Sequence, residues 1–94
     1  MIRHLVFLHQ RIREAFLQHA YADIEDVRLR RLARAIASLP DRQHEVFRLA
    51  RFDNLTTYGI AQRLGISEAE ARAEFVIALT LVTASVERQR RKGW

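Results

Sequence analysis

The chain has 94 residues, of which 49% are hydrophobic, with only three glycines and one proline. This composition predicts one folded domain with a modest core and excludes a disordered or low-complexity chain. The absence of cysteine excludes disulfides, thiolate metal sites and a cysteine nucleophile, and the net charge of +5 favours polyanionic partners.

Targeting and catalytic signals are weak throughout the chain. The N-terminal run MIRHLVFLHQR has too short an apolar block for a signal peptide, and no apolar run is long enough to span a bilayer. The four histidines lack metal-ligand spacing, and no Ser–His–acid or paired-carboxylate arrangement stands out. We therefore expect a cytoplasmic protein that is not an enzyme, without catalytic residues, a metal, a cofactor or a membrane contact.

The apolar spacing is helical along the whole chain. A first helix is predicted over residues 2–19, as an N-terminal amphipathic segment of residues 1–20. Its buried stripe should be Ile2, Leu5, Leu8, Ile12, Ala15 and Phe16. Asp23 is the predicted cap of a second helix that extends to about Leu39. That helix should bury Leu29, Leu32, Ala33 and Ile36 and expose Arg28, Arg30, Arg31 and Arg34.

Three more helices are predicted in the second half of the chain. Pro40 suits the first turn of a third helix, which ends at the turn signal RFDN. Thr56 should cap a short helix, TYGIAQRL, and Gly65 should end it in the left-handed conformation. Ser67, with Glu70 three residues later, should cap a last helix of about 25 residues.

The stretch TTYGIAQRLGISEAEARAEF, residues 56–75, has the spacing of a helix-turn-helix. Its predicted core residues are Ile60, Ala61, Leu64, Ile66, Ala71 and Phe75. The sequence therefore predicts an all-α fold of about five helices, in which residues 23–92 form a domain with a C-terminal helix-turn-helix and a long last helix.

Residues 35–67, AIASLPDRQHEVFRLARFDNLTTYGIAQRLGIS, resemble region 4 of sigma-70-type factors, especially the extracytoplasmic-function group. The resemblance rests on Leu39-Pro40, Arg42, Glu45-Val46-Phe47, Leu49, Phe52-Asp53, Leu55, Ile60-Ala61, Arg63-Leu64-Gly65-Ile66 and Ser67. It implies a domain that docks on RNA polymerase and recognises the −35 promoter element with its last helix. No segment resembles region 2 of that family, so we expect a stand-alone region 4.

The resemblance also implies a set of DNA-binding residues, namely Thr56, Thr57, Arg63, Ser67 and Arg72. The basic runs at 28–34 and 88–92 are further candidate contacts to DNA or polymerase. The last helix departs from the family at Ala73, Glu74 and Ile77, where small polar and basic residues are usual. Because phosphates and base edges mostly reward cations, we expect specific DNA binding to be weak and strongly salt-dependent.

The last helix also carries more apolar residues than one buried face requires. Phe75, Leu79 and Val82 suit the core, whereas five others should form a protein interface: Val76, Ile77, Thr80, Leu81 and Ala84. We expect a homodimer or an obligate partner of another protein. Two hypotheses stay open at this point. The chain is either a region-4-like regulator acting through promoter DNA or RNA polymerase, or a dimeric module that has lost DNA recognition and binds a sigma, anti-sigma or polymerase subunit.

Overall fold

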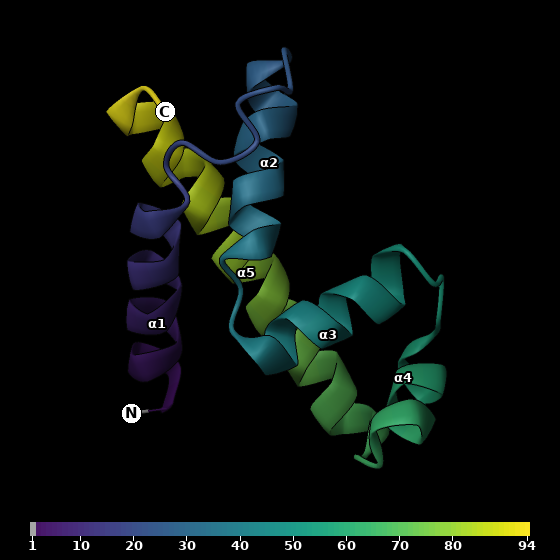
Figure 1. Ribbon diagram of the computed structural model, residues 1–94. Helices are drawn as coiled ribbons and strands as arrows, with labels where there is room; N and C mark the ends of the chain where they lie inside the picture. The colour runs from purple at the N-terminus through teal and green to yellow at the C-terminus, as the bar shows by residue number, and fades with distance from the viewer. Residues whose placement is uncertain (1) are drawn as a thin grey trace. The chain divides into compact units, whose positions relative to one another are not determined.

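The computed structural model describes the backbone of residues 2–94 and the side chains from Leu5 onward, so Met1 and the side chains of Ile2, Arg3 and His4 lie outside the described residues. The described residues form five helices and no strand: α1 (Ile2–Phe16), α2 (Val27–Ala37), α3 (Asp41–Arg51), α4 (Thr57–Leu64) and α5 (Glu68–Lys92) (Figure 1). The all-α class and the 25-residue last helix are thus confirmed. None of these helices is long and apolar enough to cross a membrane.

The helices form two compact units. The first contains the chain up to Pro40 together with Leu81–Trp94, and the second contains Asp41–Thr80. The helix α5 therefore belongs to the second unit in its first half and to the first unit in its second half. Its two halves pack against different helices, which explains why its apolar residues do not follow a single stripe.

The second unit has an apolar core made by α3, α4 and the start of α5. Its buried residues are Val46, Leu49, Ile60, Ala61 and Ala71, and Ala50, Leu55, Leu64, Ile66 and Phe75 pack against them. Every core residue predicted for the helix-turn-helix is in this cluster. Complete burial of a side chain such as Leu49 contributes about 1.5–3 kcal/mol. The unit is therefore held together mainly by apolar packing around the turn between α4 and α5.

The first unit contains a polar interior at α1, which reverses the predicted orientation of that helix. Gln10 and Glu14 are buried, whereas Leu5, Leu8, Ile12 and Phe16 of the predicted stripe are exposed. The physical reason is a polar network: the Arg88 guanidinium of α5 donates to both carboxylate oxygens of Glu14, over 2.8 and 3.1 Å. The Gln10 amide donates to the Ser38 hydroxyl over 3.3 Å. A hydrogen-bonded ion pair can occupy an interior position that the apolar periodicity assigns to leucine.

The helix α2 is also turned differently from the prediction. Arg34 is buried, whereas Leu29 and Leu32 are exposed. Arg34 is held inside because its guanidinium donates to the carbonyl oxygens of Ala20, over 3.0 Å, and Trp94, over 2.8 Å. The N-cap residue of α2 also differs from the predicted one.

Asp26, and not Asp23, caps α2. Its carboxylate accepts the N–H of Arg28 over 2.9 Å. This hydrogen bond is the main reason why the pKa of Asp26 lies below its ordinary value. The helix therefore begins at Val27, three residues after the predicted start region.

Candidate nucleic-acid interface

The helix-turn-helix is built by three local devices that the sequence predicts. Thr56 accepts the N–H of Gly59 over 3.1 Å and so caps α4. Gly65 ends α4 at φ 68° and ψ 35°, a conformation in which a side chain is strained. Ser67 then accepts the N–H of Glu70 over 3.0 Å at the start of α5. Two of the five candidate DNA-binding residues, Thr56 and Ser67, therefore have a structural role as caps.

Glu68 connects two other candidates. Its Oε1 accepts a hydrogen bond from the Thr57 hydroxyl over 3.2 Å and lies 3.6 Å from the Arg72 guanidinium. Thr57 and Arg72 thus meet at one carboxylate instead of projecting independently. The fifth candidate, Arg63, is exposed on the last turn of α4. The role of Glu68 could have been inferred from the sequence, because Glu68 and Arg72 are four residues apart on a helix.

Glu74 has a partner inside the second unit. Its carboxylate accepts a hydrogen bond from the Gln43 amide of α3, which is buried. This contact gives the acidic residue a structural explanation at a position where the family usually has a base. Arg51, also on α3, lies over the ring of Phe75 at 5.4 Å from its centroid. The sequence carried no local signal for either contact, because both join residues that are far apart in the chain.

Beside the exposed Arg72, the exposed side of α5 in the second unit carries small and apolar residues. Ala69, Ala73, Val76 and Thr80 are all exposed and recur at intervals of three or four residues. They therefore share one side of the helix. The Thr80 hydroxyl donates to the Val76 carbonyl within the helix, over 2.8 Å. This face offers few hydrogen-bond donors to base edges.

The five residues predicted as a protein interface do not share one environment. Val76 and Thr80 are exposed, Ile77 and Ala84 are half-buried, and Leu81 is completely buried. The burial of Leu81 corrects the expectation that it lies on a free face. It is buried because the second half of α5 packs within the first unit, where Val82 and Ser85 are buried too.

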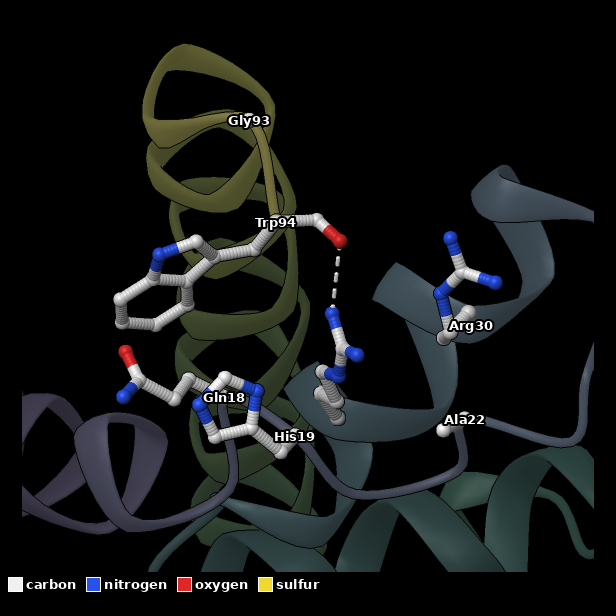
Figure 2. A pocket seen from close by; sticks show the side chains of 7 residues that line it. Gln18, His19, Ala22, Arg30, Gly93 and Trp94 are labelled. Atoms are coloured by element: carbon white, nitrogen blue, oxygen red, sulfur yellow. Dashed lines mark hydrogen bonds between the residues drawn. The ribbon is translucent and has the colours of Figure 1, made fainter.

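The basic run of α2 is partly engaged in folding. A hollow of about 290 Å³ in the first unit is lined by Gln18, His19, Ala22, Arg30, Arg34, Gly93 and Trp94 (Figure 2). In it Arg34 donates to the Trp94 carbonyl, while Arg30 donates to the carbonyl of Ile24 over 2.7 Å. Burial, followed by the neighbouring charges of Arg30 and Arg31, lowers the pKa of the Arg34 guanidinium.

The C-terminal basic run is used in the same way. Arg88 is paired with Glu14, and Arg90 forms hydrogen bonds to Glu87 over 3.0 and 2.6 Å. The side-chain hydrogen bond to Glu87 raises the pKa of Arg90, and the same bond lowers the pKa of Glu87. The two basic runs, which the sequence offers as candidate contacts to DNA or polymerase, are therefore partly used in folding, because Arg30, Arg34 and Arg88 bind groups inside the first unit.

A capped helix-turn-helix with an exposed start of its second helix is the recognition unit of many transcription proteins. Residues 29–75, half of the chain, match the family described as Sigma-70, region 4, and the chain belongs to this family. Domains of the family are non-enzymatic and contact promoter DNA and RNA polymerase, so the chain has a sigma-factor-like role in transcription. No curated protein and no solved structure matches the chain. The helix α1 lies outside the matched residues.

Proposed function

We propose that the chain regulates transcription through contacts with protein, on a region 4 scaffold that no longer recognises a promoter sequence. The observation that carries this proposal is the engagement of Thr57 and Arg72 by Glu68 at the start of α5. A cation that already faces a carboxylate offers less to a phosphate or a base edge. Among the neighbouring exposed positions, Ala69 and Ala73 have no hydrogen-bonding side chain, and Glu70 is acidic.

The free energy of individual base contacts supports weak sequence specificity in DNA binding. One good bidentate contact between a side chain and a base contributes about 1–3 kcal/mol of discrimination against a wrong base. Losing two such contacts would remove about 2–6 kcal/mol of a gap between specific and nonspecific binding that is typically about 4–10 kcal/mol. The net charge of +5 still supplies a sequence-independent attraction to DNA, which weakens steeply as salt rises.

The partners that the family favours are RNA polymerase and proteins that bind sigma factors. Homodimerisation through α5 stays a prediction, now restricted to the exposed Val76 and Thr80 and the half-buried Ile77. Cytoplasmic location also stays part of the proposal, since a transcription role requires access to polymerase.

A gel-shift assay and a pull-down with core RNA polymerase and its sigma factors, on one preparation, test the proposal. We expect polymerase or a sigma factor to be retained, and DNA to bind without sequence preference and only at low salt. Glu68→Arg should raise DNA affinity, because it frees Arg72 and adds a cation at the helix start. Glu45→Arg is the matched control, since it makes the same charge change at an exposed position of α3. Nanomolar binding of the unmodified chain to one sequence at physiological salt, with large penalties for single base changes, would contradict the proposal.

A further inference from the structure

The outer face of α1 is an unusual surface for a small domain. Leu5, Leu8, Ile12 and Phe16 are 64%, 49%, 51% and 87% exposed. Their spacing of three, four and four residues places them on one side of the helix. We call these four residues the α1 stripe. A contiguous exposed apolar surface of this kind marks an interaction site more often than isolated exposed leucines do.

The polar inner side of α1 keeps the stripe exposed. Glu14 and Arg88 are paired at 2.8 Å in the interior of the first unit, and Gln10 is bonded to Ser38. The Arg13 guanidinium also donates to the Leu39 carbonyl over 2.9 Å. Rolling α1 to bury the stripe would break all of these interactions and leave Arg88 without its carboxylate. The chain therefore cannot cover the stripe by a simple rotation of the helix.

A hollow adjoins the C-terminal end of the stripe. It has a volume of about 260 Å³ and is lined by Arg13, Phe16, Leu17 and Ala37. Phe16 belongs to both the stripe and the hollow, so the two features are continuous. The hollow is shallow and open, so it offers one apolar side chain of a partner helix a contact with Phe16 and Leu17.

The charges beside the stripe select the kind of partner. The cation Arg11 is exposed on α1, and Glu14, the one acidic residue of the helix, is buried against Arg88. A second copy pairing antiparallel about a two-fold axis at the middle of the stripe would bring Arg11 close to the Arg11 of its mate, and like charges beside a helix seam repel. Acidic residues on a partner helix would instead complement this rim.

We propose that the α1 stripe docks an amphipathic helix of another protein, with apolar residues at helical spacing and Asp or Glu where its flank meets Arg11. One of its apolar side chains would enter the hollow beside Phe16. This inference rests on the proposed function only in that the partner is a protein. It assigns the contact to α1, which lies outside the residues 29–75 that match the family. A helix of 15 residues is about 22 Å long, so the contact is smaller than a standard interface of roughly 1,200–2,000 Å² and is readily reversible.

The test uses two labelled synthetic peptides and fluorescence anisotropy. Both are amphipathic helices with leucine on one face, and they differ only in glutamate or lysine on the flanks. We expect the glutamate peptide to bind with micromolar affinity and the lysine peptide at least ten-fold more weakly. Leu8→Glu should abolish binding, and Arg11→Glu should reverse the preference between the peptides. Leu29→Glu is the matched control, because Leu29 is exposed on α2 and outside the stripe.

Two results would overturn the proposal. One is equal binding of both peptides that Leu8→Glu leaves unchanged. The other is a stable dimer in light scattering that Leu8→Glu converts to a monomer, since a second copy would then cover the stripe. Circular dichroism of each variant verifies that it is folded. The gel shift of the Leu8→Glu variant separates this proposal from the proposed function: DNA binding should not change, whatever its specificity proves to be.

Discussion

Replacing Glu14 by glutamine tests whether the inward polar face of α1 holds the first unit together. Glu14 is 2% exposed and Arg88 14% exposed, and their bidentate pairing joins α1 to α5. Glutamine keeps the shape of the side chain and removes its charge. The Arg88 guanidinium would then stay buried without a counter-charge, with the Gln10 amide oxygen at 3.4 Å as a remaining acceptor.

Removal of one partner from a buried ion pair destabilises a protein by about 3–5 kcal/mol. Because Arg88 keeps some access to water, we expect about 3 kcal/mol for Glu14→Gln. A chain of this length has a total stability of roughly 5–14 kcal/mol, so the loss is a large fraction. For a domain of up to about 100 residues, 1 kcal/mol shifts the melting temperature by about 4–8 °C, which gives a decrease of roughly 12–24 °C.

Thermal unfolding and urea unfolding, both followed by circular dichroism, measure this effect. Glu87→Gln is the matched control, because the exposed Glu87–Arg90 pair makes similar hydrogen bonds and should leave the melting temperature unchanged within error. The double variant Glu14→Leu, Arg88→Leu should recover most of the stability, since an apolar pair leaves no buried charge. A melting temperature for Glu14→Gln equal to that of the unmodified chain would refute the orientation of α1 described above.

Three further predictions concern caps and turns. Gly59→Ala should stabilise the chain by up to about 1 kcal/mol in urea unfolding, because alanine is the better helix former. The added Cβ would make an ordinary contact of 3.4 Å with Leu55. A lower unfolding midpoint would show that the site is tighter than described. Gly65→Ala should destabilise it by about 1–2 kcal/mol, although nothing lies within 4 Å of the added Cβ, since the backbone there has φ 68°; an unchanged midpoint would contradict a left-handed Gly65. The contribution of the Asp26 cap should be complete above its ordinary pKa of 3.8 and disappear as the pH falls through the lower folded value. The stability difference between the unmodified chain and Asp26→Ala should therefore shrink on acidification, and a difference that grows towards low pH would exclude this cap.

Local structure could be predicted from the sequence because short-range chemistry decides it. Thr56, Gly65 and Ser67 end or begin helices through hydrogen bonds and backbone angles that involve only neighbouring residues. The core of the helix-turn-helix was predicted for a similar reason, since α4 and the start of α5 pack across a short turn. Residues 35–67, which overlap this core, carried the resemblance to region 4, and the family match over residues 29–75 confirms it.

Tertiary structure decided which side of a helix is inside. The periodicity of the sequence separates an apolar face from a polar face on α1 and on α2, and it predicts that the apolar face is buried. This prediction was wrong for Leu8, Phe16 and Leu29, which are exposed. The interior of the first unit instead takes Glu14 and Arg34, because each finds its hydrogen-bond partners in residues distant along the chain. A buried charge is tolerated only where such partners exist, and their positions are set by the packing of whole helices. The arrangement of the candidate DNA-binding residues depends in the same way on Glu68, whose contact with Thr57 joins two helices across the turn.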